Sequence, residues 1–464
     1  MAHFLSTPIA SLFQKSLTDS FIPPQWKESK ITPIPKIACP VSESDFRPIS
    51  ITPTLCKILE KLLVQSYYYP VFTNPMKNSM FTDQFAFRPT GSTSAALIAL
   101  THHLLETLEH EPFARLISLD FSKAFDTARH NSLAVKLAPL PIPDFVYNWV
   151  IALLHGRVHC TKFCGIISSY RSINASFVQR SGLGPSNFLI TISGLKPLHE
   201  GNRLFKYADD CYLVIPASGI STTESELLNI EQWSKSCNLR LNTSKSCEII
   251  LTRPHNRLDV TVPPIAGIDR VTNLKILGVT LSQRIGFSLH INKICCSAKQ
   301  AMFALRVLVS HGLTGNRLHD VVRSTIVARM LYSSPAWWGF VNLGERERLN
   351  SILRKLIKHG FLPSQSLTFE EICVKADRSL FSTILSDPGH VLHGLLPPVR
   401  KMRYSLRPHS HNREIPRSNL LTIKGLLPGC FIPINKFYHY ATLLLLLCVI
   451  FIQFRCPIVR FQMD

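Results

Sequence analysis

The chain has 464 residues, of which 46% are hydrophobic, and this length allows roughly two to four compact units with sizeable cores. Its 51 Lys and Arg against 30 Asp and Glu give a net charge of +21, which favours a polyanionic partner, nucleic acid before a membrane surface. The 13 cysteines show no paired Cys-x-x-Cys spacing, which argues against a zinc module and fits a reducing compartment inside the cell.

The first informative strand in chain order ends in an acidic residue. Leu116 to Leu119 is a short apolar run, and Asp120 follows it directly. An acid at a strand end suits a two-metal phosphoryl-transfer site, provided that a second acidic segment arrives from another strand. Two Mg²⁺ ions about 3.5–4 Å apart need shared carboxylates of this kind.

The second acidic segment is the tetrad Tyr-Ala-Asp-Asp at residues 207–210. It lies between the apolar runs Leu204-Phe205 and 211–215, a pattern that predicts two strands joined by a tight turn. The adjacent acids Asp209 and Asp210 repel each other and resist burial in an apolar hairpin, so a bound divalent cation is one reason to place them there. An ordinary acidic turn is the alternative, because Asp is common in turns.

Downstream of residue 284 the pattern changes to helical spacing. Apolar residues recur every three or four positions, at Ile291, Ile294, Ala298, Ala301, Met302, Leu305 and Leu308, with Lys293 and Lys299 between them. Further helical segments are predicted at 322–330 and 349–357, the latter with Arg354 and Lys355. Their basic surface could follow the phosphates of a nucleic-acid duplex, while a solvated charged face is the alternative for each residue.

A series of motifs runs in order through the first three-fifths of the chain. They are Trp26-Lys27, ITPIPK at 31–36, DFRPIS at 45–50, DQFAFRP at 83–89, the Asp120 segment, QRSGLGP at 179–185, the tetrad, Asn242 with Lys245, and LKILGV at 274–279. In this order they resemble the reverse transcriptases of non-LTR, LINE-type retrotransposons, most closely the jockey-like group. Such agreement of order and content is not expected from chance.

The resemblance implies an α+β fold of the right-hand polymerase type. Fingers would occupy residues 1–112, shortened at the amino-terminal end, and a palm with an antiparallel sheet and packed helices would occupy 113–283. A helical thumb at 284–360, a carboxy-terminal region at 361–430 and a hydrophobic divergent tail at 431–464 would follow. Full-length relatives commonly carry an endonuclease upstream, so target cleavage is not assigned to this chain.

The resemblance further implies an RNA-directed DNA polymerase that transfers nucleotides to a primer 3′-hydroxyl. Asp120, Asp209 and Asp210 would be catalytic and would hold two Mg²⁺ ions, or Mn²⁺, with the Phe121 carbonyl as a further oxygen ligand. The partners would be an RNA template, a DNA primer and deoxynucleoside triphosphates. The sequence does not indicate an oligomeric state.

Other residues are expected to contact the substrates. Phe125 would lie under the sugar of the incoming nucleotide, where its ring would collide with a 2′-hydroxyl; a core Phe is the alternative. The nucleotide-binding set is completed by Gln179, Lys36, Arg47 and Lys245, and the nucleic-acid-binding set comprises Arg88, Lys293, Lys299, Arg354 and Lys355. Arginine suits phosphate because its planar fork can bind two oxygens at once. Each cation in these sets could instead be structural or a solvated surface charge.

Two positions depart from the family pattern. Arg180 and Ala86 stand where the family usually has Gly. A bulky cation at Arg180 would perturb the nucleotide pocket, so a catalytically silent remnant that at most binds nucleic acid is the alternative function.

The tail contains 18 nearly all apolar residues at 437–454, flanked by Lys436 and Arg455. This is just below the roughly 20 residues that span a bilayer. A membrane anchor is one interpretation, and sequence beyond a truncated or frame-shifted copy of the element is the other and favoured one, because nothing in the resemblance requires a membrane. No amino-terminal signal peptide is evident, and nucleus and cytoplasm are both open as compartments.

Overall fold

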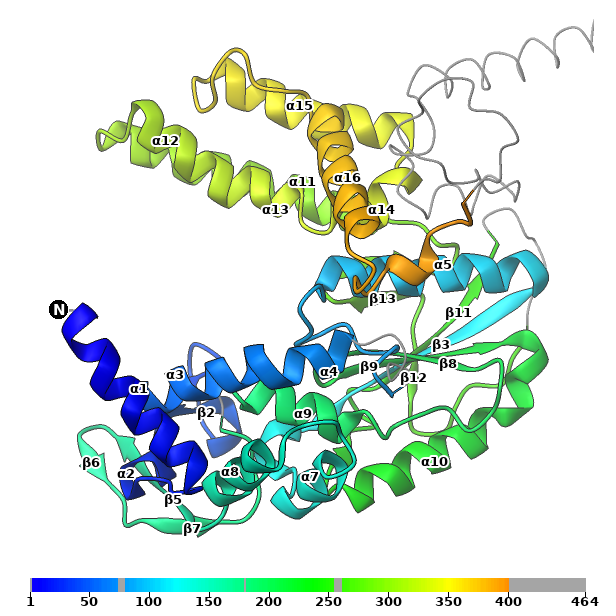
Figure 1. Ribbon diagram of the computed structural model, residues 1–464. Coiled ribbons are helices and arrows are strands. Elements are labelled where there is room, and N and C mark those ends of the chain that lie inside the picture. Colours follow the sequence, from blue (N-terminus) through cyan, green and yellow to red (C-terminus); the bar gives the residue numbers. More distant parts are fainter. Residues whose placement is uncertain (1, 74–79, 179–180, 254–260, 400–464) are drawn as a thin grey trace, which may run out of the picture. The chain divides into compact units, whose positions relative to one another are not determined.

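The computed structural model describes residues 2–73, 80–178, 181–253 and 261–399 (Figure 1). These residues form helices and largely antiparallel sheets, which confirms the predicted α+β class. The chain divides into two compact units, unit 1 with residues 1–286 and 388–394 and unit 2 with residues 287–387 and 395–464. The break near residue 286 lies close to residue 284, where the predicted thumb begins.

Unit 1 is built on a five-stranded sheet with the strand order β12-β11-β3-β9-β8. The central strand β3 (Phe113–Leu119) pairs antiparallel with β9 (Asp210–Pro216) on one side and with β11 (Cys247–Thr252) on the other. β8 (Arg203–Tyr207) forms a hairpin with β9, and β12 (Asp269–Arg270) runs parallel to β11. The hairpin predicted around the tetrad is therefore confirmed.

Both faces of this sheet are covered, which explains why its central strands β3 and β9 are largely apolar. Ile117 and Leu213 belong to a core that also includes residues of α9 (Gly184–Ile192) and α10 (Thr223–Ser236). Because side chains alternate along a strand, the buried Leu116 and Val214 face the other side, where α5 (Thr93–His110) contacts β3 and β8. Figure 1 shows α5 and α10 on opposite faces of the sheet.

A second sheet carries the motifs ITPIPK and DFRPIS, on β1 (Glu28–Pro35) and β2 (Phe46–Ile51). β1 pairs antiparallel with β2 and parallel with β5 (Arg157–Phe163), and the register of the first pair places Ile34 opposite Arg47. The short strands β6 (Ile166–Ile167) and β7 (Arg171–Ile173) also pair with β5.

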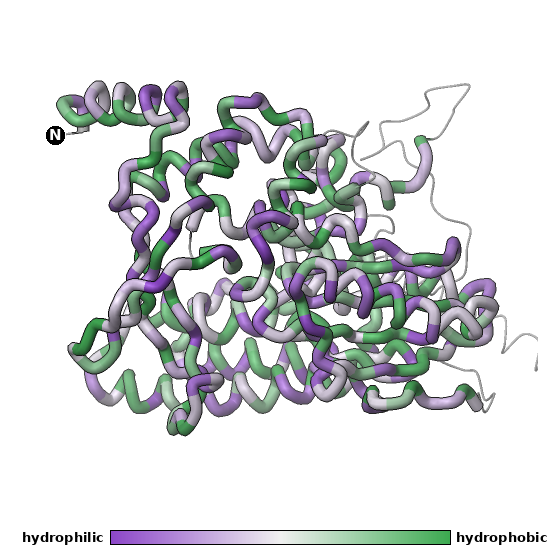
Figure 2. Tube along the Cα trace, turned by 90° about the horizontal axis from the view of Figure 1, so that it is seen from below, coloured by the Kyte–Doolittle hydropathy of each residue, from purple (hydrophilic) through white to green (hydrophobic). Residues whose placement is uncertain are grey.

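Helices at the amino-terminal end pack through a few large side chains. Figure 2 shows hydrophobic and hydrophilic residues interspersed along α1 (Ala2–Thr18), which contacts α8 (Asp144–Leu154). In this contact the Trp149 Nε1 donates a hydrogen bond to the Ser16 Oγ at 2.9 Å. The ring of Phe13 on α1 also meets Trp26 of α2 (Pro24–Lys27) edge-on. The remaining elements of unit 1 are α3 (Thr54–Leu63), a π-helical turn (Val64–Tyr68), α4 (Tyr69–Thr73), β4 (Phe121–Ser122), α6 (Ala124–Thr127), α7 (His130–Leu137), β10 (Arg240–Leu241), β13 (Asn273–Ile276) and β14 (Val279–Ser282).

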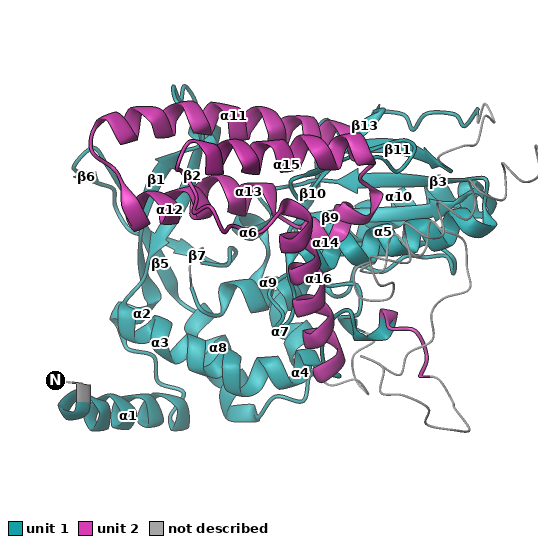
Figure 3. Ribbon diagram, turned by 90° about the horizontal axis from the view of Figure 1, so that it is seen from above, with its two compact units in different colours: residues 1–286, 388–394 teal, residues 287–387, 395–464 magenta. Residues whose placement is uncertain are grey.

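Unit 2, drawn in magenta in Figure 3, is helical as the sequence predicts. Its α-helices are α11 (Ser288–Ser310), α12 (Gly315–Val322), α13 (Ala328–Met330), α14 (Ser334–Trp337), α15 (Leu343–Lys358) and α16 (Phe369–Ser386), with a π-helical turn (Arg323–Val327) between α12 and α13. Capping boxes start two of them, formed by Asn342 with Glu345 and by Thr368 with Glu371. The predicted apolar face of α11 is buried at Ile291, Ile294, Ala298, Met302 and Leu305, whereas Ala301 is half-buried and Leu308 is 45% exposed.

Among the described residues, no helix has both the length and the apolar character required to cross a bilayer. The apolar segment 437–454 lies outside the described residues.

Candidate active site

Three acidic side chains meet at one corner of the central sheet. Asp120 directly follows β3, whose last residue Leu119 pairs with Cys211 of β9. Asp210 is the first residue of β9, so the antiparallel register brings it opposite Asp120. Asp209 occupies the turn between β8 and β9. The fold thus gathers three acids that the sequence supplies from two distant segments.

The turn itself adopts an uncommon backbone conformation. Tyr207 pairs with Asp210, so Ala208 and Asp209 are its two central residues. Ala208 has a φ of 56°, in the left-handed region that residues with a Cβ rarely adopt. Such backbone strain costs about 1–3 kcal/mol and clusters at functional sites. Here it places Asp209 at the tip of the hairpin beside Asp210.

The carboxylates of this corner repel one another. Burial raises the pKa of Asp210 to about 6, and the charges of Asp209 and Asp120 act in the same direction. Burial also raises the pKa of Asp209, a backbone hydrogen bond opposes this, and Asp120 adds to the rise. Asp209 and Asp210 are open to solvent on one side while protein surrounds the other sides, so solvent screens part of this repulsion. Within the described residues, none of the three forms a salt bridge.

The pH dependence of stability should report this repulsion. The pKa of Asp210 lies near 6 in the folded chain, above its ordinary value of 3.8, so between these values the folded state binds more protons than the unfolded state. The contribution of Asp210 to the free energy of unfolding therefore falls as pH rises from about 4 to 6. We expect Asp210→Asn to raise the melting temperature of the metal-free protein by about 1–2 °C at pH 7 and to change it little near pH 4. Calorimetry in a chelator measures this, and an unchanged or lower value at pH 7 contradicts it.

A segment downstream of the hairpin holds the backbone of Asp120. The Asn242 N–H donates to the Asp120 carbonyl at 2.8 Å, and the Asp120 N–H donates to the Ser246 Oγ at 3.2 Å. The same Ser246 hydroxyl donates to the Asn242 carbonyl at 2.8 Å. The Asn242 motif therefore supports the first acid, and Lys245 lies exposed in the same segment.

The chemistry of this corner fits a divalent cation. Repelling carboxylates without a cationic partner gain most from a bound metal, whose charge reverses their pKa shifts. Within the described part of the chain, no group of three or more His, Cys, Asp or Glu side chains could by itself hold a metal ion. Mg²⁺ does not require such a cage, since one or two carboxylates with waters and substrate phosphates usually suffice.

The aromatic residue Phe125 lies shortly after the first acid, on α6. Its half-buried ring stacks on Phe188 of α9 with ring centroids 4.2 Å apart and meets Phe87 edge-on at 6.2 Å. The Phe125 carbonyl accepts a hydrogen bond from the Phe177 N–H at 2.8 Å. The ring is therefore held in place by neighbouring aromatics.

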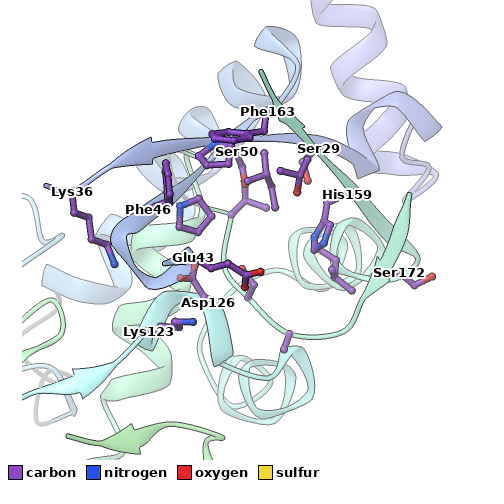
Figure 4. A pocket seen from close by; sticks show the side chains of 18 of the residues that line it. Ser29, Lys36, Glu43, Phe46, Ser50, Lys123, Asp126, His159, Phe163 and Ser172 are labelled. Carbon is purple, nitrogen blue, oxygen red and sulfur yellow. The ribbon is translucent and has the colours of Figure 1, made fainter. Parts of the chain in front are cut away.

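A pocket of about 950 Å³ opens between the second sheet and the segment after Asp120 (Figure 4). Lys36 contributes to its lining, together with Lys123 and Asp126, two charged residues that the sequence analysis did not assign to substrate. Glu43, also in the lining, stands near Asp126 in Figure 4. Lys123 has a φ of 50°. It lies three residues after Asp120, and this closeness in sequence could have indicated that Lys123 belongs to the site. Glu43 gave no signal, because it belongs to none of the motifs.

The nucleotide-binding candidates of the second sheet are at the surface. Lys36 is exposed and its Nζ donates to the Ser44 carbonyl at 2.8 Å, and Arg47 on β2 is exposed as well. Gln179 and the unusual Arg180 lie outside the described residues.

Arg88 has a different environment from the one expected of a nucleic-acid contact. Its side chain is 7% exposed, and its guanidinium donates to the carbonyls of Phe72 and Phe81, both at 2.8 Å, and of Gln84 at 3.3 Å. Burial lowers the pKa of this guanidinium, partly offset by the charge of Asp83. In this structure Arg88 ties together the loop that contains its own motif.

Removing this buried donor should therefore destabilise unit 1. We expect Arg88→Ala to lower the free energy of unfolding by about 3 kcal/mol, because buried carbonyls lose their donor. Urea denaturation of the purified chain measures the loss, with the exposed Arg47→Ala as the control that changes little. A loss below that of the control contradicts this structural role.

The basic residues predicted on the thumb are all in unit 2 and all exposed. They are Lys293 and Lys299 on α11 and Arg354 and Lys355 on α15. Arg354 forms a surface salt bridge with Glu347, a contact that contributes little to stability.

Comparison with protein families gives a match at residues 34–281, more than half of the chain, to the family described as reverse transcriptase (RNA-dependent DNA polymerase). This range contains the three acids, Phe125 and the pocket lining from Lys36 onward, and it ends before unit 2.

Comparison with curated proteins finds related chains of mobile elements. The RNA-directed DNA polymerase from mobile element jockey of Drosophila melanogaster is 28% identical over 303 residues, which cover 62% of this chain and 32% of the relative. The probable RNA-directed DNA polymerase from transposon BS of the same organism is 26% identical, with 66% and 35% covered. The chain thus spans about a third of the length of these relatives. Among solved structures, telomerase from Candida tropicalis in complex with a TWJ fragment of telomeric RNA is similar at 12% identity and a TM-score of 0.42, with 85% of this chain and 68% of that chain covered.

Proposed function

This chain belongs to the reverse transcriptase family, and on that premise we propose that it extends a primer 3′-hydroxyl with deoxynucleotides on an RNA template. The predicted resemblance to the jockey-like, non-LTR group is confirmed by its relatives. The observation that carries the proposal is the convergence of Asp120, Asp209 and Asp210 at one corner of the antiparallel sheet, inside the residues that match the family.

Membership of the family implies dependence on a divalent metal ion. We assign Asp120, Asp209 and Asp210 as the residues that would hold two Mg²⁺ ions, or Mn²⁺, with the Phe121 carbonyl as a further oxygen. When bound, the metal would lower the pKa of the primer hydroxyl and neutralise charge on the leaving pyrophosphate. The strained turn at Ala208 contributes by fixing Asp209 and Asp210 side by side before substrate binds.

The pocket between the second sheet and the segment after Asp120 is the proposed place of the incoming nucleotide and the adjoining template. Lys36 and Lys123 bring positive charge to its lining, which suits phosphate. Arg47, Gln179 and Lys245 complete the proposed nucleotide-binding set, and Phe125 would select the sugar. Arg88 is left out of the nucleic-acid contacts because its donors already bind backbone carbonyls.

We propose that basic residues of unit 2 bind the primer-template duplex. Lys293, Lys299 and Lys355 are exposed cations on long helices, and Arg354 shares its charge with Glu347. Phosphate contacts of this kind bind nucleic acid independently of its sequence and weaken as salt rises. We accordingly assign residues 1–112, 113–283 and 284–360 to fingers, palm and thumb.

Primer extension tests the proposal directly. The purified chain should lengthen a labelled DNA primer on an RNA template when deoxynucleotides and Mg²⁺ are supplied, and a chelator should stop the reaction. A well-folded chain that binds the duplex and yields no product with either Mg²⁺ or Mn²⁺ would identify a silent remnant instead.

A further inference from the structure

We propose that Glu60 is a positioning residue that sets the preference for deoxynucleotides over ribonucleotides. It fixes the first turn of α9, the helix that carries Phe188, and the ring of Phe188 supports Phe125. The inference rests on the proposed polymerase function and extends it to a residue outside all the motifs. Glu60 lies on α3, which the sequence does not connect to the nucleotide site.

Glu60 is a buried carboxylate that accepts from main-chain donors at the start of another helix and, through its Oε1, from the Cys56 Sγ at 3.2 Å. Its side chain is 1% exposed, and its Oε2 accepts from the N–H groups of Gly182 at 2.5 Å and Leu183 at 3.1 Å. Leu183 is the residue before α9, and the Gly184 N–H donates to the Ser181 Oγ at 2.7 Å. The free donors and the positive dipole end of a helix favour a negative charge at this place.

The glycines of this segment show how closely α3 approaches. A Cβ added to Gly182 would lie 2.8 Å from the Glu60 Cβ and 2.9 Å from the Lys61 nitrogen, so no larger residue fits without movement of the backbone. A Cβ at Gly184 would lie 2.7 Å from the Val178 carbonyl oxygen. α3 and the segment before α9 therefore pack in one compatible arrangement, and the Glu60 carboxylate stabilises it.

A buried cation, the guanidinium of Arg157, shares this region. Arg157 is 3% exposed, and a cavity of about 20 Å³ is lined by Glu60, Arg157 and Ser181, which is room for one water molecule. Burial lowers the pKa of Arg157 and the charge of Glu60 raises it again. The guanidinium and the Glu60 carboxylate both line this cavity, which is large enough for a water to bridge them.

The anchored helix leads directly to the predicted sugar-selecting ring. Asn187 and Phe188 follow within the first turns of α9, and Phe188 stacks on Phe125 at 4.2 Å. The helical run that carries Glu60 holds α9 at a second point, where the Tyr68 hydroxyl donates to the Asn187 Oδ1 at 3.3 Å. A shift of α9 would therefore move the surface on which Phe125 rests, and a steric filter depends on displacements well below 1 Å.

Glu60→Gln tests the inference because it keeps the volume and removes the charge. We expect the ratio of kcat/KM for a deoxynucleotide to that for the matching ribonucleotide to fall about tenfold, equivalent to about 1.4 kcal/mol of discrimination. In the unliganded protein, hydrogen exchange of the α9 amides nearest Glu60 should accelerate, a readout that requires no activity.

The chain offers a matched control in Glu226. This residue is also a fully buried carboxylate that anchors a loop, accepting from the N–H groups of Leu198 and His199 at 2.8–3.0 Å, but it lies on α10. Glu226→Gln should lower the melting temperature about as much as Glu60→Gln does. It should leave unchanged both the ratio of kcat/KM for deoxynucleotide and ribonucleotide and the hydrogen exchange of the α9 amides. An unaltered ratio in an active Glu60→Gln enzyme, or unaltered α9 exchange, overturns the inference. An inactive wild-type chain overturns the proposed function instead, and the inference about selection with it.

Discussion

Replacement of Asp209 by alanine is expected to reduce Mg²⁺-dependent primer extension on an RNA template at least about a thousandfold, since each tenfold step corresponds to 1.36 kcal/mol and metal stabilisation of the transition state supplies several kcal/mol. Asp209 stands at the tip of the β8–β9 hairpin, and after burial its charge is the next cause that raises the pKa of Asp210. Quantified extension of a labelled primer over a range of Mg²⁺ concentrations measures the effect.

The same sheet provides a carboxylate for comparison. Asp269 is exposed on β12, at the opposite edge from the β8–β9 hairpin, so Asp269→Ala removes an equal charge away from the site. Its extension rate should stay within about twofold of the wild type, as for a surface change remote from function. Retention of more than a tenth of the wild-type rate by Asp209→Ala would exclude this residue as a metal ligand.

The corner of acids was predictable because each of its parts carries a local signal. An apolar strand that ends at Asp120 and an apolar hairpin that turns at Asp209 both follow from the alternation of strands and the chemistry of turns. Their meeting depends on the antiparallel register of β3 with β9, which the sequence alone does not specify. The resemblance to the family supplied that step, and the structure agrees with it.

Other features depend on contacts between distant segments and gave no local signal. Arg88 belongs to a motif with the composition of a phosphate contact, yet its guanidinium lies among backbone carbonyls of its own loop. Glu60 reads in the sequence as one more charge on an amphipathic helix, and only the packing of α3 against the segment before α9 turns it into an anchor. Burial of a charge depends on the tertiary neighbours that pair with it, which local periodicity does not encode.

Replacement of Phe125 by alanine is expected to increase ribonucleotide incorporation relative to deoxynucleotide incorporation about a hundredfold, equivalent to about 2.7 kcal/mol of lost discrimination. The ring is held between Phe87 and Phe188, so it has little freedom to move away from a 2′-hydroxyl placed above it. Steady-state kinetics with matched deoxynucleotide and ribonucleotide pairs gives the ratio, and Phe125→Tyr, which keeps the ring, should retain the wild-type preference. Equal ratios for the alanine variant and the wild type would assign Phe125 to the core only.

The double variant Glu60→Gln with Phe125→Ala separates a shared mechanism from two independent effects. Suppose that Glu60 acts on sugar selection only by holding Phe188 beneath Phe125. Glu60→Gln should then change the ratio of kcat/KM for deoxynucleotide and ribonucleotide about tenfold in the wild-type background, and by less than about twofold once the Phe125 ring is absent. The reason is that the effects of residues that act through one contact are not additive. Additive losses would mean that α9 influences the sugar by a route that does not pass through Phe125. The stacking of Phe125 on Phe188 predicts the non-additive outcome, because this stack is the direct contact through which a movement of α9 would reach the ring that selects the sugar.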